Sequence, residues 1–209
     1  VYADRLGKLL ERYGAPAIVN AGVPGDTTAA ARERFANDVL VRHPAVVIIQ
    51  FGINDAAVDV WRDPPPTTPR VPLDTYIANL RYFIDEARMA KAQPVLMTPN
   101  PLRWTDALKK QYGKPPYAPD DPEGFNTLLK DYAAAMRMVA KDLVVPLLDV
   151  DGLFRRAATT TAIGGVDHLL LDGMHPNAKG HELIAQALVP VIAPLLKTTA
   201  AAPCRGPAS

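Results

Sequence analysis

Ala45-Val46-Val47-Ile48-Ile49-Gln50-Phe51 is the stretch that decides the fold. It is apolar and β-branched without a break, as expected for a parallel strand that is covered on both faces. Three other runs, at 17–20, 94–98 and 144–150, are also predicted strands, and helical patterns lie between them. Strands that alternate with helices predict an α/β protein, a three-layer α/β/α sandwich around a mostly parallel sheet.

Apolar residues at helical spacing predict the helices of the two outer layers. The first helix should end at Gly14, where positive φ costs nothing. Asp26 or Thr27 should cap the second helix, and Asp74 the third. The predicted helices cover residues 2–13, about 28–40, 74–87, 129–140, about 152–158 and about 177–195.

Two long connections, 56–73 and 99–124, follow predicted strands and are rich in proline, so we expect them to be irregular. Ligands of such sheets bind beyond the carboxyl ends of the strands. Loops of this length are uncommon in a compact domain unless they have a function. We therefore expect them to form a substrate rim, in which Trp104, Tyr112 and Tyr117 either contact the substrate or pack the loop.

Composition excludes several classes of protein. The 209 residues predict one domain, residues 1–197, followed by a disordered Ala/Pro tail at 198–209. The net charge of +1 gives no reason to expect a nucleic-acid partner, and the single cysteine gives no zinc-site spacing. No apolar run reaches the roughly 20 residues of a transmembrane helix. Oligomeric state and location stay open; an extracytoplasmic location would require a signal peptide upstream of Val1.

The run Leu169-Leu170-Leu171-Asp172-Gly173-Met174-His175-Pro176 is the main candidate for chemistry. An acid and an imidazole three residues apart in a turn can pair, so that the carboxylate holds one ring nitrogen and the other can accept a proton. The alternative is structural: Asp172 caps the last helix and His175 is a polar turn residue.

Two other polar features follow predicted strands. Asn54-Asp55 comes directly after the strongest strand, and Gly25 comes after the run at 17–20. Each has a structural alternative, since Asn54-Asp55 can cap the residues that follow and Gly25 can be an ordinary turn glycine.

Taken together and in order, these motifs resemble the SGNH, or GDSL-type, hydrolase family of esterases and lipases. The segments that correspond to the family's second, third and fifth blocks are Asn20-Ala21-Gly22-Val23-Pro24-Gly25-Asp26-Thr27-Thr28, Gly52-Ile53-Asn54-Asp55 and Asp172-Gly173-Met174-His175-Pro176. The resemblance implies a doubly wound, flavodoxin-like sheet. It also implies that Gly25 and Asn54 donate to an oxyanion hole, that His175 is the general base and that Asp172 orients it.

The family's first block, Gly-Asp-Ser, is missing. The only serine is Ser209, and Thr27 is an improbable substitute because its segment matches the second block better. In the order that the resemblance implies, the strand bearing this block lies between the runs at 17–20 and 45–51. We therefore expect that strand, and the nucleophile, upstream of Val1.

The resemblance implies a serine ester hydrolase that needs no metal or organic cofactor. Its expected substrate is a small acyl ester, such as an O-acetyl group on a carbohydrate, because the loops are aromatic and no broad apolar lid segment is present. Two alternatives are kept: a lysophospholipase or thioesterase of the same family, and a non-catalytic carbohydrate-binding relative that lacks the nucleophile.

Overall fold

The computed structural model describes residues 1–200, without the side chains of 197–200. In it, the strand β2, Gln93–Met97, lies at the centre of a parallel sheet. On one side it pairs with β1, Val46–Gln50, so that Ile48 is opposite Val95. On the other side it pairs with the short β3, Leu147–Leu148. The predicted strands at 45–51 and 94–98 are confirmed, and that at 144–150 is reduced to these two residues.

Seven α-helices surround the sheet among the described residues. They are α1 Tyr2–Leu10, α2 Thr28–Asp38, α3 Leu73–Met89, α4 Asp106–Tyr112, α5 Leu129–Asp142, α6 Val150–Ala158 and α7 Ala178–Ala200. Short 3₁₀ turns lie at Glu11–Tyr13, Leu40–Arg42, Gly124–Asn126 and Val166–Leu169.

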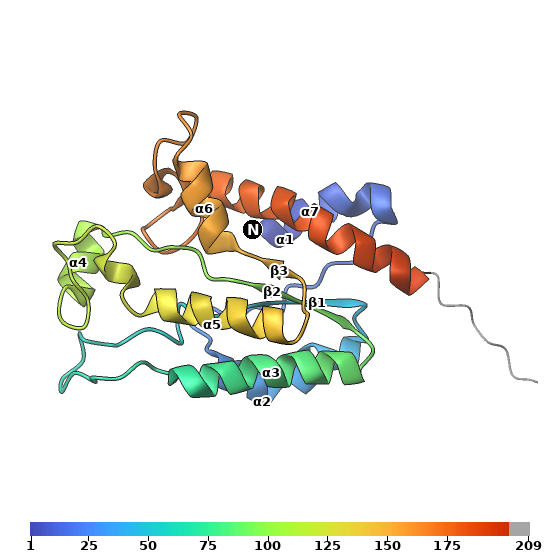
Figure 1. Ribbon diagram of the computed structural model, residues 1–209, viewed down its shortest axis with the longest axis horizontal. Coiled ribbons are helices and arrows are strands. Elements are labelled where there is room, and N and C mark those ends of the chain that lie inside the picture. Colours follow the sequence, from blue (N-terminus) through green and yellow to red (C-terminus); the bar gives the residue numbers. More distant parts are fainter. Residues whose placement is uncertain (201–209) are drawn as a thin grey trace, which may run out of the picture.

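The helices form two layers, one on each face of the sheet (Figure 1). Side chains of β2 alternate between them. Val95 and Met97 are fully buried against α1, α6 and α7, whereas Leu96 is fully buried against α2, α3 and α5. Both faces are apolar and covered, which explains the unbroken hydrophobic runs and confirms the predicted α/β architecture.

Most helix boundaries follow from local chemistry. Gly14, at φ 102°, ends the first helical segment, and the Thr27 hydroxyl accepts a hydrogen bond from the Ala30 N–H at the start of α2. The prediction for Asp74 was wrong, since α3 begins one residue earlier and Pro72 occupies the cap position. The 99–124 connection is also less irregular than predicted, because Thr105 caps α4 within it.

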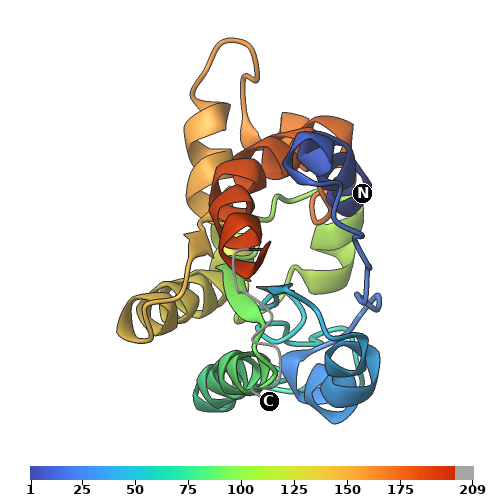
Figure 2. The ribbon, with the colours of Figure 1, turned by 90° about the vertical axis from the view of Figure 1, so that its right-hand side faces the viewer.

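The predicted strand at 17–20 is not present. These residues have no strand partner, and the side chains of Ile18 and Val19 are 38% and 57% exposed. Among residues 1–200 no strand pairs with the outer edge of β1, and the chain from α1 to α2 runs alone along the side of the layers (Figure 2). An apolar run becomes a strand only where a neighbouring strand offers backbone partners.

Of the predicted tail, residues 198–200 continue α7, and residues 201–209 lie outside the described part of the chain. Across residues 1–200, no helix combines the length and the apolarity that crossing a membrane would require.

Candidate active site

The turn before α7 pairs an acid with an imidazole. One carboxylate oxygen of Asp172, Oδ2, lies 2.8 Å from Nδ1 of His175. The other, Oδ1, accepts the backbone N–H groups of Met174 at 3.0 Å and His175 at 2.8 Å. Asp172 therefore closes its own turn and holds the imidazole, and the side chain of His175 is 72% exposed.

The helix-cap alternative for Asp172 is wrong. It is Asn177 that accepts hydrogen bonds from the first N–H groups of α7, those of Lys179 and Gly180, at 2.9 and 3.1 Å. Burial pushes the pKa of the Asp172 carboxyl upward. The donors from the His175 N–H, the His175 ring and the Met174 N–H outweigh burial and hold this pKa below its ordinary value. Asp172 therefore remains a carboxylate beside the imidazole of His175.

Asn54 follows β1 and extends its amide toward the segment that precedes α2. Its Nδ2 donates to the backbone carbonyl of Asp26 at 2.9 Å. Its Oδ1 accepts from Arg70 at 3.2 Å, and Arg70 itself donates to both carboxylate oxygens of the buried Asp59. None of the hydrogen bonds of residues 56–61 goes to the Asn54 side chain, which argues against its role as a local cap. An amide has two N–H donors, so the second remains for another acceptor.

Gly25 lies in the turn that faces Asn54. Its φ is +80°, a conformation that glycine adopts without strain, and the turn is closed by the Asp26 N–H donating to the Val23 carbonyl. Arg34 anchors the turn through two contacts with Asp26, at 2.9 and 2.6 Å. Gly25 is exposed, and its N–H has no acceptor among the described residues.

Asp55 is a residue whose role sequence reasoning missed. It is fully buried and accepts from the Thr28 N–H, the Thr28 hydroxyl and the Gly52 N–H, at 2.8, 2.5 and 3.1 Å. Burial raises the pKa of this carboxyl above its ordinary value, although the three donors pull it down. Asp55 ties the start of α2 to the loop after β1, and so keeps Gly25 and Asn54 in register. Its full burial beside a strand end was the only signal, and burial is not readable from sequence.

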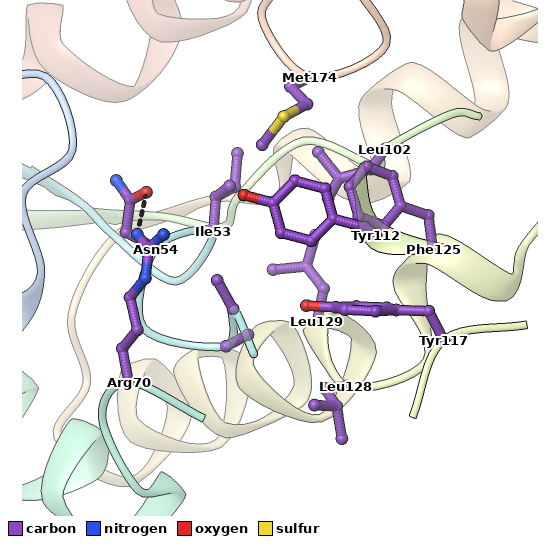
Figure 3. Close-up of a pocket in the computed structure, with 12 residues that line it drawn as sticks. Ile53, Asn54, Arg70, Leu102, Tyr112, Tyr117, Phe125, Leu128, Leu129 and Met174 are labelled. Atoms are coloured by element: carbon purple, nitrogen blue, oxygen red, sulfur yellow. Dashed lines mark hydrogen bonds between the residues drawn. The ribbon is translucent and has the colours of Figure 1, made fainter. Parts of the chain in front are cut away.

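A small apolar pocket lies between the loop after β1, the 99–124 connection, the start of α5 and the turn before α7 (Figure 3). Asn54 and Arg70 line one side of the pocket, and Tyr112 and Tyr117 line the opposite side. Met174, from the turn that carries Asp172 and His175, lines a third side. The lining residues are Ile53, Asn54, Ala56, Ala57, Arg70, Leu102, Tyr112, Tyr117, Phe125, Leu128, Leu129 and Met174.

The three aromatic candidates differ in position. Tyr112 and Tyr117 line the pocket, whereas Trp104 lies behind it, stacked on Phe125 with ring centroids 4.4 Å apart. Trp104 also donates its indole N–H to the Asp121 carbonyl at 3.1 Å, so it packs the long loop. In residues 1–200 no three His, Cys, Asp or Glu side chains are grouped as a metal ion would require.

A parallel sheet between helix layers carries an acid–imidazole pair on a turn that reaches the pocket through Met174, and an amide, that of Asn54, that lines the same pocket. This is the arrangement of an α/β/α ester hydrolase. The chain belongs to the GDSL-like lipase/acylhydrolase family, whose sequence model matches residues 1–183. The family and the ester hydrolase class predicted from the sequence motifs are thereby confirmed.

The chain is also similar to individual proteins. The chain is 34% identical to the uncharacterized lipoprotein YqeF of Bacillus subtilis (strain 168), over 82% of this chain and 71% of that protein. It is 30% identical to an acetylxylan esterase of Geobacillus stearothermophilus, over 82% and 70% of the two chains. The crystal structure of Axe2, an acetylxylan esterase from Geobacillus stearothermophilus, superposes with a TM-score of 0.71 at 25% identity, over 91% of this chain and 80% of the other.

Proposed function

We propose that the protein is a serine ester hydrolase that removes small acyl groups, such as O-acetyl groups on carbohydrates, through an acyl-enzyme. The observation that carries this proposal is the 2.8 Å pair of Asp172 and His175 on a turn whose Met174 lines the same pocket as Asn54. An imidazole held at Nδ1 has Nε2 free for proton transfer.

In the proposed mechanism, the serine hydroxyl attacks the ester carbonyl carbon while its proton passes to Nε2 of His175. The carbonyl oxygen becomes an oxyanion, to which the Gly25 N–H and the second N–H of Asn54 donate. Collapse breaks the bond to the alcohol, which leaves with the proton from His175. A water molecule then repeats the sequence on the acyl-enzyme, giving the carboxylic acid and free serine. Asp172 holds the ring and stabilises the imidazolium.

We propose further that this serine belongs to residues upstream of Val1, on a strand beside β1. Two observations support this placement. The outer edge of β1 has no strand partner among residues 1–200, and apolar Ile18 and Val19 are exposed on the segment that would flank the added strand. Thr27, the other candidate nucleophile, is less suited to this role, because its hydroxyl accepts the Ala30 N–H as the cap of α2.

The lining of the pocket supports the proposal that the substrate carries a small acyl group. Most of the pocket wall is apolar, and its one charged lining residue among residues 1–200, Arg70, is paired with Asp59. The apolar lining residues include Tyr112, Tyr117, Phe125, Leu102 and Leu129. The name of the acetylxylan esterase relative agrees with acetyl transfer from a carbohydrate. Tyr112 and Tyr117 are proposed to contact the acyl group, and Trp104 to support them from behind.

The test compares residues 1–209 with the gene product that includes the residues encoded upstream. The longer form should be labelled by a fluorophosphonate probe at one serine and should hydrolyse p-nitrophenyl acetate. Residues 1–209 alone should do neither. If the upstream sequence carries no Gly-Asp-Ser block and the longer form is not labelled, the proposal fails and a non-catalytic carbohydrate-binding role takes its place.

Acyl length is tested on the same longer form with p-nitrophenyl acetate, butyrate, octanoate and palmitate. We expect kcat/KM to be highest for acetate or butyrate. Fastest turnover of palmitate would instead identify a lysophospholipase or thioesterase of the same family.

A further inference from the structure

The loop after β2 holds the turn that carries Asp172 and His175. Asn100, flanked by Pro99 and Pro101, is only 3% exposed. Its Nδ2 donates to the Met174 carbonyl at 2.9 Å and to the Pro101 carbonyl at 3.2 Å. The two prolines fix φ on either side of Asn100, so its amide has little freedom to follow the turn if the turn moves.

A backbone contact reinforces this link. The Arg103 N–H donates to the Gly173 carbonyl at 2.8 Å. Gly173 has φ +86°, and a Cβ at this position would overlap the Arg103 carbonyl oxygen. The loop and the turn therefore touch through backbone, which requires glycine at 173.

The loop after β2 is itself held by hydrogen bonds with Asn126. Asn126, which is 4% exposed, accepts from the Leu102 N–H at 2.7 Å and donates to the Leu102 carbonyl at 2.9 Å. This two-way bond replaces the strand partner that Leu102 lacks beyond the end of β2. Contacts thus run without interruption from Asn126 through Leu102 and Arg103 to Gly173.

Hydrogen bonds within the turn and hydrogen bonds from the turn to its neighbours have different effects. The bonds between Asp172 and His175 set the geometry of the pair but not its place relative to Asn54. The turn is joined to the α7 side by the Leu171 N–H, which donates to the His175 carbonyl, and by the amide of Asn177, which donates to the Leu170 carbonyl. Among the hydrogen bonds of residues 1–200, only those from Asn100 and Arg103 join it to the loop after β2, which follows the central strand of the sheet.

We infer that Asn100 is a positioning residue: its buried amide, by holding the Met174 carbonyl, sets where His175 stands relative to Asn54. This inference rests on the proposed function. A displacement of about 1 Å can cost on the order of 100-fold in rate, so loss of this bond should act on turnover rather than on substrate binding.

The experiment replaces Asn100 by Ala and, to keep the volume, by Asp, whose carboxylate cannot donate to the Met174 carbonyl. Tyr132→Phe is the matched control, because it also removes a buried hydrogen bond, from the Tyr132 hydroxyl to the Val71 carbonyl, but one that joins α5 to the segment before α3 and involves no residue of the turn. In the form that hydrolyses p-nitrophenyl acetate, both Asn100 variants should lower kcat about 10- to 100-fold with KM within about 2-fold. Tyr132→Phe should retain kcat within about 2-fold.

A second measurement does not depend on activity, and its first part uses only the wild-type chain. In residues 1–209, the Asn100 side-chain amide protons should exchange slowly and show a nuclear Overhauser effect to Met174. In Asn100→Ala, the ring signals of His175 should broaden or shift. Wild-type kcat with unchanged His175 signals in a folded Asn100→Ala, or rapid exchange of the Asn100 amide, overturns the inference. Absence of all turnover in the wild-type longer form instead refutes the proposed function and leaves the amide measurement valid.

Discussion

The side-chain amide of Asn54 donates to the backbone carbonyl of Asp26 at 2.9 Å, across 28 residues of sequence. This bond joins the loop after β1 to the turn before α2, so Gly25 and Asn54 lie on adjoining segments. The Asp172–His175 pair reaches the same pocket through Met174. Two of the three sequence motifs therefore line one pocket, and the Asn54–Asp26 bond joins the third motif to them. Unless stated otherwise, each variant below is measured in the longer, active form.

Replacing Asp172 with Asn should lower kcat by roughly 10³- to 10⁴-fold, because the amide can favour the wrong tautomer of His175 and cannot stabilise an imidazolium. Hydrolysis of p-nitrophenyl acetate measures the change. Asp85→Asn, an exposed site on α3, is the matched control and should leave kcat unchanged. Equal activity of the two variants would remove Asp172 from the mechanism.

Asn54→Ala should lower kcat by about 10²- to 10³-fold with little change in KM, since an oxyanion donor acts on charge that exists only in the transition state. Steady-state kinetics separate the two constants. A rise in KM at constant kcat would mean that Asn54 binds the substrate in its ground state and does not serve the oxyanion.

Asp55→Ala should lower the free energy of unfolding by about 2–4 kcal/mol, because it leaves the Thr28 and Gly52 donors buried without an acceptor. Urea denaturation of residues 1–209 measures this. Asp74→Ala, at an exposed position in the first turn of α3, should cost less than about 1 kcal/mol. A small loss at Asp55 would show that α2 and the loop after β1 are held together by other contacts.

Asp172 and Asp55 should titrate on opposite sides of the ordinary aspartate value of 3.8. The pKa of Asp172 is lowered, so the stability that its carboxylate contributes is present above pH 3.8 and is lost as pH falls through the lower folded value. The pKa of Asp55 is raised, so burial of its charge lowers stability as pH rises from 3.8 through the higher folded value. Carboxyl ¹³C shifts in residues 1–209 report both midpoints, and a reversed order would contradict the assigned environments.

Sequence reasoning succeeded where the deciding interactions are local or periodic. The unbroken run at 45–51 indicated a strand covered on both faces, and the spacing of Asp172 and His175 indicated a pair closed within one turn. Both depend on neighbours within a few residues. The strand expected at 17–20 was wrong for the complementary reason: a strand requires a partner, and no described residue provides one beside β1.

The sequence by itself determined the layered α/β architecture, the order of the motifs and the family to which they point. Only the tertiary structure decided which side chains support these motifs. The supporting hydrogen bonds are those of Asp55 with Thr28, of Arg70 with Asn54, and of Asn100 with Met174. These contacts join residues 16 to 74 positions apart. Hydrogen bonds between such distant groups depend on how complete elements pack, and neither propensity nor periodicity encodes the choice of partner.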